Sequence, residues 1–211
     1  MKITKFGHCC LLIEMKGLRI LTDPGNYSTK QNEIKDIDVV LITHEHQDHL
    51  HIESLKTVLR NCPEAIVVTG GGVGKILEKD GIRYDILGNG SKRKYGGVLL
   101  EGYGEKHAEI YSTVNPVENI GYFIDNTLFY PGDAFTDPGK DIDILALPVA
   151  GPWMKISEAI EYALKLRPDK AFPVHDGNLK SFGIAHRLPN EILNREGIKF
   201  IVLEEGKEIE F

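Results

Sequence analysis

Alternating and continuous runs of apolar residues divide the chain into many short strands and a few amphipathic helices. The pattern predicts strands near residues 3–6, 11–15, 19–22, 38–42, 65–68, 98–101, 121–124, 127–130, 142–147, 170–174, 199–203 and 207–211. It predicts helices near 52–60, 73–79 and 155–166, and helical turns within 179–195. The apolar residues of 155–166 recur at the spacing of a stripe that packs against a sheet.

The order of these elements predicts the fold class. Both halves of the chain begin with strands and continue with strands and helices in alternation, which indicates an α+β or α/β layered sandwich rather than a simple barrel. No segment rich in Pro, Gly or Ser separates the halves, and 211 residues suit one compact domain. We therefore expect a single domain over residues 1–211.

Composition and charge narrow the classes of partner. The chain has 42% hydrophobic and 27% charged residues, which is typical of a globular protein. Its formal charge of −6 gives no electrostatic reason to expect a nucleic acid or an anionic membrane as partner. No apolar run approaches the roughly 20 residues that span a bilayer, and the opening segment lacks the long apolar stretch of a secretory signal.

The three cysteines indicate a reducing compartment. Their number is odd, and Cys9 and Cys10 are adjacent while Cys62 lies far along the chain, so they do not resemble a disulfide framework. We therefore expect a cytoplasmic protein. The sequence leaves a homo-oligomer open.

The strongest chemical signal directly follows a buried apolar strand. His44, His46, Asp48 and His49 lie within six positions. Side chains alternate between faces in an extended segment, so His44 and His46 can share one metal ion while Glu45 points away. Asp48 and His49 come where the chain turns, and they can address a second ion that accepts nitrogen and oxygen ligands. A solvated polar loop and pH-responsive histidines are the alternative interpretations.

Three further candidate ligands also follow strand ends. His107 comes after the strand near 98–101, Asp133 lies in a Gly-Asp step after a strand, and His175 follows another strand. Loops at strand ends can converge, so one rigid scaffold can hold side chains from distant segments. Taken singly, each residue has an ordinary interpretation, because lone loop histidines are common and Gly-Asp is a frequent turn dipeptide.

Together these residues resemble a known family. The order HxHxDH, a later His, a later Asp in a Gly-Asp step and a last His is similar to that of the metallo-β-lactamase superfamily. The resemblance covers nearly the whole chain and implies an αββα sandwich with metals at one edge. Shorter segments look like the branch that contains ascorbate-6-phosphate lactonase and many uncharacterised hydrolases: Phe6-Gly7-His8, Leu11-Leu12-Ile13-Glu14, Leu21-Thr22-Asp23-Pro24, Asn119-Ile120-Gly121-Tyr122 and Leu147-Pro148.

The resemblance also implies two divalent metal ions and their ligands. It assigns His44, His46 and His107 to the first ion, Asp48, His49 and His175 to the second, and Asp133 as the bridge between them. Zn²⁺ is the expected metal, and nitrogen and carboxylate ligands also accept Mn²⁺ or Fe²⁺.

The family pattern narrows these roles further. Asp23 matches an early aspartate that supports the metal loops without binding metal itself. The lack of a cysteine near Asp133 argues against the zinc β-lactamases that use a Cys ligand there. His46 argues against the diiron flavoprotein branch, where a Glu normally stands at that place.

This set of residues predicts a hydrolase. Two divalent ions make hydroxide available near neutral pH and stabilise the oxyanion that forms on attack. Asp48 is the expected catalytic residue, because it can orient the water and accept its proton. The ions outweigh Asp48, Asp133 and a bridging hydroxide by one positive charge, so we expect a small anionic substrate with an ester, lactone or phosphodiester bond.

Two other function classes stay open. One is a phosphodiesterase or nuclease that acts on nucleic acid, although the length and charge leave little room for added binding surfaces. The other is a metal-binding sensor or scaffold that keeps the site without turnover.

Weaker motifs have ordinary interpretations. The glycine-rich run at 70–75 lacks the spacing of a phosphate loop and predicts a strand-to-helix turn, whose free amides leave a minor substrate contact open. His8 is expected either to line the pocket or to make a structural hydrogen bond. Trp153 follows a strand and could wall the pocket, with Lys155 available for an anion, although ordinary packing is the first expectation. We expect surface positions for His51 and His186 and a solvated turn for the basic run 91–94.

Overall fold

The structure is a computed structural model that describes residues 1–211, and it contains two sheets of seven strands each. The first sheet consists of β1 (Lys2–Gly7), β2 (Cys10–Met15), β3 (Leu18–Thr22), β4 (Val39–Ile42), β5 (Ile66–Thr69), β6 (Tyr84–Ile86) and β14 (Glu208–Glu210). The second consists of β7 (Lys92–Tyr95), β8 (Val98–Tyr103), β9 (Gly121–Ile124), β10 (Leu128–Tyr130), β11 (Ile144–Pro148), β12 (Lys170–Val174) and β13 (Lys199–Phe200).

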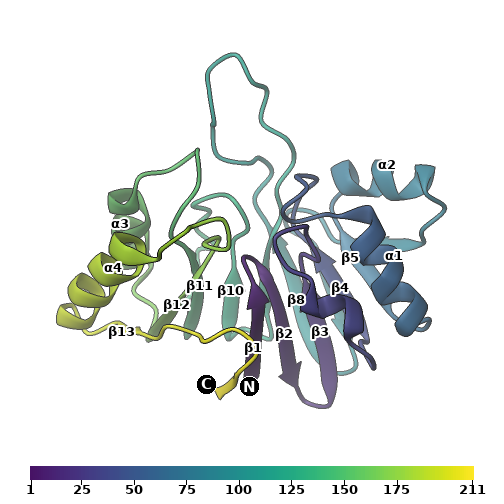
Figure 1. Cartoon of the computed structure of the whole chain (residues 1–211), viewed down its shortest axis with the longest axis horizontal. Coiled ribbons are helices and arrows are strands. Elements are labelled where there is room, and N and C mark those ends of the chain that lie inside the picture. Colours follow the sequence, from purple (N-terminus) through teal and green to yellow (C-terminus); the bar gives the residue numbers. More distant parts are fainter.

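Four α-helices cover the outer faces of the two sheets (Figure 1). They are α1 (Ile52–Asn61) and α2 (Gly71–Lys79) on the first sheet, and α3 (Ile156–Leu166) and α4 (Gly183–Arg195) on the second. A short 3₁₀ turn, η1 (Lys30–Glu33), precedes β4. The layers are therefore helix, sheet, sheet and helix, which confirms the αββα sandwich.

The apolar pattern explains these layers. In β4, Val39 and Leu41 belong to the core between the sheets, whereas Val40 and Ile42 pack under α1 and α2. All four side chains are buried, as expected for a continuous apolar strand. In β10, Tyr130 faces the other sheet, while Phe129 packs under α3 and α4. Each central strand thus contributes to two apolar layers.

The strand directions bring many loops to one edge. In the first sheet, β1 and β3 both run antiparallel to β2, and β4 runs parallel to β3. In the second sheet, β8 and β10 both run antiparallel to β9, and β11 and β12 run parallel to β10. The carboxyl ends of β1, β3 and β4 therefore lie on one side of the first sheet, and those of β8, β10, β11 and β12 lie on one side of the second. Loops at these ends can bring functional side chains together.

Two strands were missing from the sequence prediction. The basic run 91–94 was predicted to be a turn, and this was wrong, because Lys92–Tyr95 forms β7 at the edge of the second sheet. Its three basic residues are exposed, so the strand needs no apolar alternation, and charges on an edge discourage pairing with other chains. The short strand β6 forms the opposite edge of the first sheet. Other differences concern boundaries, such as the start of α4 at Gly183 rather than near 179.

All three cysteines are free and buried. None of the helices combines the length and the apolar character that crossing a bilayer requires. The two ends of the chain lie close together, with β14 paired to β1 (Figure 1).

Candidate metal centre

The seven predicted metal ligands meet at the edge where the strands end. Their ligand atoms form overlapping groups in which all atoms lie within 4.8 Å of one another. The three groups are His44 with His46 and His107; His8 with Asp48, His49 and His175; and Cys9 with His49 and Asp133. Residues separated by more than a hundred positions in the sequence therefore share one cluster.

The segment after β4 presents its side chains as the extended pattern predicts. His44 is buried and Glu45 is exposed, and His46 returns to the site, with its Nδ1 atom 3.1 Å from Nε2 of His44. The chain then turns, because the amide of His49 donates to the carbonyl of His46 at 2.9 Å. This turn brings Asp48 and His49 to the second group of ligands.

A glycine in the loop after β3 lets the metal-binding loop approach closely. A Cβ atom on Gly25 would lie 1.8 Å from the carbonyl oxygen of Asp48, so no other residue fits without a backbone shift. The neighbouring amide of Asn26 donates to the carbonyl of Gln47 at 2.9 Å. The two loops therefore hold each other in place.

Asp133 lies between the two groups of ligands. Its Oδ2 atom is 2.8 Å from Nε2 of His175, 3.3 Å from Nε2 of His107 and 3.9 Å from Nε2 of His44. Its Oδ1 atom is 3.2 Å from Nε2 of His49. One carboxylate thus faces imidazoles from both groups, which is the arrangement needed for a bridging ligand.

Asp23 fixes the orientation of His49 directly and that of His44 through Thr43. Its Oδ2 atom accepts hydrogen bonds from Nδ1 of His49 at 2.7 Å, from the hydroxyl of Thr43 at 2.8 Å and from the hydroxyl of Tyr130 at 2.5 Å. Because the Thr43 hydroxyl donates its proton to Asp23, its oxygen accepts from Nδ1 of His44 at 3.0 Å. Both imidazoles carry their hydrogen on Nδ1, and their Nε2 atoms face Asp133.

His107 is oriented by the backbone instead. Its Nδ1 atom donates to the carbonyl of Ala108 at 2.6 Å, so Nε2 is again the atom that faces the centre. Five buried atoms of the candidate ligands have no hydrogen-bond partner: Nε2 of His49, His107 and His175, Nδ1 of His175, and Oδ1 of Asp133. Unpaired buried polar atoms are rare, and their concentration in this cluster fits a bound cation. Imidazole nitrogens with carboxylate oxygens suit Zn²⁺, Mn²⁺ or Fe²⁺.

The charges of the centre also favour a cation. Burial opposes ionisation of Asp133, yet His49 and His175 hold the pKa of this carboxyl well below its usual range. Burial would lower the pKa of His49, but Asp133, Cys9 and Asp23 raise it well above the usual value. Without metal, a proton on His49 therefore supplies positive charge that a divalent ion can replace.

His8 makes structural hydrogen bonds, one of the two roles that the sequence left open. Its Nδ1 atom accepts from the amide of Gly177 at 3.1 Å, so its Nε2 atom carries the hydrogen and donates to Oδ2 of Asp48 at 3.1 Å. Burial lowers the pKa of His8 to about 4, so the ring is neutral at pH 7. Burial opposes ionisation of Asp48, but the hydrogen bond from His8 and the charge of His49 keep its pKa well below the usual value.

Three residues of the centre have unusual backbone conformations. His8, Asp23 and His175 have positive φ angles of 49°, 35° and 63°. Residues other than glycine rarely adopt this region, and such strain tends to persist where the surrounding structure fixes a functional site. These three residues lie at strand ends beside the candidate ligands, whereas five other non-glycine residues with positive φ lie elsewhere in the chain.

Some contacts of this region were not predicted from the sequence. Trp153 is buried and packs against Phe135 as expected, but its indole N–H also donates to Oδ2 of Asp133 at 2.9 Å, which was not predicted. The signal available in the sequence was its place after a strand end.

A surface position for His186 was wrong: it is 9% exposed, and its Nε2 atom lies 2.8 Å from Oδ2 of Asp176. Asp176 in turn forms a buried ion pair with Lys5, whose Nζ atom is 2.5 Å away.

Two weaker expectations can be compared with the structure directly. Lys155 is exposed, and its amide donates to the carboxylate of Glu158 at the start of α3. His51 is half-buried at the start of α1, with Nδ1 3.0 Å from the hydroxyl of Ser54. Neither residue belongs to the cluster of ligand atoms.

Only Gly70 of the glycine-rich run links β5 to α2, and residues 71–75, predicted as part of a turn, already belong to the helix. The anion contact left open there is filled by the protein itself, because the amide of Gly72 donates to Oε2 of Glu118 at 2.5 Å. Glu118 lies at the end of the long connection between β8 and β9, which projects beyond the sheets (Figure 1).

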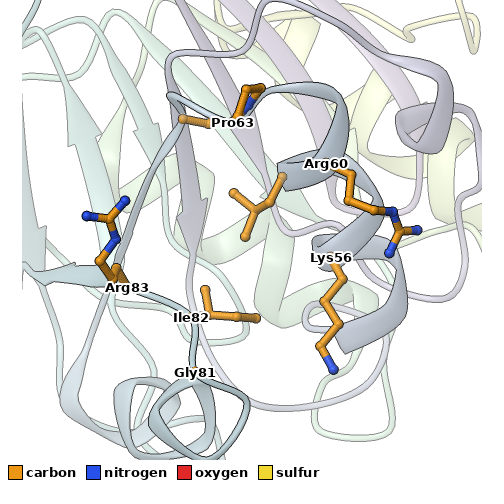
Figure 2. Close-up of a pocket in the computed structure, with 8 residues that line it drawn as sticks. Lys56, Arg60, Pro63, Gly81, Ile82 and Arg83 are labelled. Carbon is orange, nitrogen blue, oxygen red and sulfur yellow. The ribbon is translucent and has the colours of Figure 1, made fainter.

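A separate hollow lies between α1, the start of β5 and the turn before β6. Figure 2 shows Lys56 and Arg60 on α1 and Arg83 on the other side of this hollow. No His, Cys, Asp or Glu lines it, and Lys56 already pairs with Asp80 at 2.8 Å. The hollow therefore lacks the side chains that commonly bind metal ions.

Comparison with known proteins agrees with this fold. Residues 2–175 match the model of the beta-lactamase superfamily domain. Protein Rv0786c of Mycobacterium tuberculosis is 36% identical over 180 residues, which cover 83% of this chain and 84% of that protein. A UPF0173 metal-dependent hydrolase of Thermoplasma acidophilum is 28% identical over 191 residues, covering 83% of each chain.

A solved structure supports the same fold. The metallo hydrolase Igni18 from Ignicoccus hospitalis superposes with a TM-score of 0.77 at 22% identity, covering 100% of this chain and 98% of that one. The family match spans most of the sequence and includes all seven clustered ligands. The chain therefore belongs to the beta-lactamase superfamily.

Proposed function

We propose that this chain is a metal-dependent hydrolase with a dinuclear centre that cleaves an ester, lactone or phosphodiester bond of a small anionic substrate. The observation that carries the proposal is the set of imidazole Nε2 atoms that converge on Asp133 without hydrogen-bond partners. The name of the Thermoplasma acidophilum relative, a metal-dependent hydrolase, supports the same class of activity.

Seven side chains would hold the two ions. His44, His46 and His107 suit one ion, Asp48, His49 and His175 suit the other, and Asp133 reaches both groups. Bound there, divalent ions would lower the pKa of a water molecule and polarise the bond to be cleaved. We propose Zn²⁺ as the natural metal, with Mn²⁺ or Fe²⁺ as the alternatives that this donor set accepts.

Asp48 is the proposed catalytic residue because it is the carboxylate of the centre that reaches solvent. Its side chain is 22% exposed, whereas that of Asp133 is 3% exposed. Its Oδ2 atom lies 3.5 Å from Nε2 of His175 and accepts the hydrogen bond from His8. A carboxylate held in this way can orient an incoming water and accept its proton.

The charge balance of the loaded centre supports an anionic substrate. Two divalent ions exceed the charge of Asp48, Asp133 and one hydroxide, so the centre attracts a negative group. The similarity of the Phe6-Gly7-His8 and Asn119-Ile120-Gly121-Tyr122 segments to the ascorbate-6-phosphate lactonase branch supports a phosphorylated or carboxylated lactone as the first compound to try.

A substrate panel tests the proposal. Purified chain loaded with Zn²⁺ or Mn²⁺ would be assayed with lactones, thioesters, phosphodiesters and lactams, each as a neutral and an anionic analogue. We expect metal-dependent turnover and a higher kcat/KM for the anionic member of a pair. Bound metal without turnover of any compound would favour a sensor, and cleavage of structured RNA instead would favour a nuclease.

The role of Asp48 predicts a specific loss. Asp48→Ala removes the group that orients the water, so we expect kcat to fall by about 10²–10⁴-fold while the fold is retained. Glu45→Ala is the matched control, because Glu45 is an exposed carboxylate in the same loop and points away from the centre. Steady-state kinetics and circular dichroism on both variants check the prediction, and an unchanged rate for Asp48→Ala would remove Asp48 from the mechanism.

We further propose a cytoplasmic location. The three cysteines are free and buried, which suits a compartment where thiols stay reduced.

A further inference from the structure

We propose that Trp153 is a positioning residue of the metal centre, which holds the Asp133 carboxylate in one orientation through its indole N–H. This inference rests on the proposed function, because it concerns the carboxylate that would bridge the two ions. Trp153 lies in the loop between β11 and α3, and its Nε1 atom is 2.9 Å from Oδ2 of Asp133.

The hydrogen bond holds the carboxylate oxygen of Asp133 that faces two of the histidines. Oδ2 of Asp133 is also the atom that lies 2.8 Å from His175 and 3.3 Å from His107. The amide of Asp133 is fixed separately, because it donates to Oδ1 of Asn119 at 3.0 Å. That contact fixes the backbone only, so the side-chain torsions of Asp133 stay free, and the indole N–H restricts them by holding Oδ2 near His107 and His175.

A tryptophan suits this position for a chemical reason. The indole N–H is a donor only, so it can bind the carboxylate without accepting a proton or coordinating a metal. A histidine or a carboxylate at this place would compete for the ion, and a lysine would add a charge. Asp133 is 2% exposed, so water cannot easily supply the same hydrogen bond.

The surrounding structure is shaped to hold the indole. A Cβ atom on Gly151 would lie 2.7 Å from Nε1 of Trp153, so the missing side chain leaves the space that the ring occupies. The ring of Phe135 packs against Trp153 with the centroids 5.2 Å apart, and Tyr162 of α3 packs against Phe135 at 5.0 Å. The indole is thus connected to the helix layer through aromatic contacts.

Trp153 also provides its own spectroscopic readout. It is the only tryptophan in the chain, and its ring centroid lies 5.8 Å from that of His107 and 6.0 Å from that of His175. Paramagnetic Co²⁺ bound at these histidines should quench its fluorescence. Titration of the metal-free chain with Co²⁺ therefore measures binding at this centre without any assay of turnover.

Trp153→Phe tests the proposal because it keeps an aromatic ring and removes the N–H donor. We expect Co²⁺ and Zn²⁺ affinities, measured by calorimetry, to fall about 10–100-fold, as is typical when a residue that orients a metal ligand is lost. The visible absorption spectrum of the Co²⁺ form should change as well. Tyr162→Phe is the matched control, since it removes a hydrogen bond to the carbonyl of Thr136 and leaves Asp133 untouched, so its affinities should equal those of the native chain.

Gly151→Ala perturbs the same hydrogen bond without changing Trp153 itself. It is the variant to use if Trp153→Phe does not fold. Gly151 has a φ angle of +155°, which other residues rarely adopt, so circular dichroism first checks that the variant keeps the fold. In the folded variant the new methyl group should displace Nε1 and weaken metal binding, with quenching of Trp153 shifted to higher Co²⁺ concentration. Affinities within twofold of the native values in the folded variant would overturn the role of Trp153. A native chain that binds no metal and shows no quenching would overturn the metal centre itself, which is a distinguishable result.

Discussion

Hydrogen bonds on Nδ1 of three imidazoles decide which nitrogen faces the centre. His44 and His49 use Nδ1 toward Thr43 and Asp23, and His107 uses Nδ1 toward a backbone carbonyl. In each case Nε2 is the nitrogen that points toward the other ligands, so the rings are oriented for metal binding before any ion arrives. The ligands are thus prepared by residues that do not themselves bind metal.

Thr43→Val tests whether the hydroxyl group of Thr43 orients His44. The change keeps the side-chain shape but leaves Nδ1 of His44 buried without a partner and removes one of the three hydrogen bonds to Oδ2 of Asp23. We expect the free energy of unfolding of the metal-free chain to fall by about 1–3 kcal/mol. We also expect Zn²⁺ affinity, measured by competition with a chromophoric chelator, to fall about 10–100-fold.

Thr69→Val is the control for that prediction. Thr69 is equally buried, and its hydroxyl donates to the carbonyl of Ile42 at 2.8 Å, outside the cluster of ligands. It should reduce stability to a similar extent and leave Zn²⁺ affinity unchanged. If both variants bound Zn²⁺ equally well, the hydroxyl of Thr43 would have no part in orienting His44.

At the scale of elements, the connection between β8 and β9 is held at its base by Glu118. The carboxylate of Glu118 occupies the amino end of α2, where the free amides and the helix dipole favour a negative charge. The same connection carries His107, whose amide donates to the carbonyl of Val117 at 2.9 Å. The contact with α2 therefore ties a segment of the second sheet, and a candidate metal ligand, to a helix of the first.

Removal of this tie should loosen the connection. In Glu118→Ala we expect proteolytic cleavage within residues 104–119 to become several-fold faster, because the local opening of the segment costs less free energy. Limited proteolysis followed by mass spectrometry measures the rate and the site. Glu109→Ala, an exposed position on the same connection with no ion pair, should leave the rate unchanged. Equal rates for the native chain and Glu118→Ala would show that the carboxylate does not hold the segment.

The elements differ in how well the sequence predicts them. Central strands such as β4 and amphipathic helices such as α3 follow the apolar pattern, because burial on one or both faces determines their side chains. The edge strand β7 does not, because its basic side chains are exposed and only its backbone pairing with β8 places it in the sheet. That pairing is a tertiary contact that the local pattern does not contain.

The candidate site shows the same division. His44, His46, Asp48 and His49 were predicted from their spacing within one short segment. His107, Asp133 and His175 needed the family resemblance to be joined to them. Trp153 was not recognised, because its link to Asp133 crosses between two loops and depends on the space left by Gly151. Sequence spacing therefore predicts local ligand sets, whereas contacts that orient ligands from other loops require the folded chain.

Across the whole molecule, metal binding should stabilise the fold, since the ligands come from strand ends in both sheets. A ligand that binds only the folded state adds RT ln(1 + [L]/Kd), which is about 2.7 kcal/mol at a hundredfold excess over Kd. We expect the melting temperature to fall after treatment with a chelator and to recover on addition of Zn²⁺, as measured by differential scanning calorimetry. Identical melting with and without metal would indicate that the ligands do not bind an ion jointly.

The most direct measurement is anomalous diffraction at the zinc edge from crystals of the Zn²⁺-loaded chain. The account predicts two peaks about 3.5–4 Å apart, one among His44, His46 and His107 and the other among Asp48, His49 and His175, with Asp133 between them. No peak within this cluster, or peaks confined to other parts of the molecule, would contradict the proposed dinuclear centre.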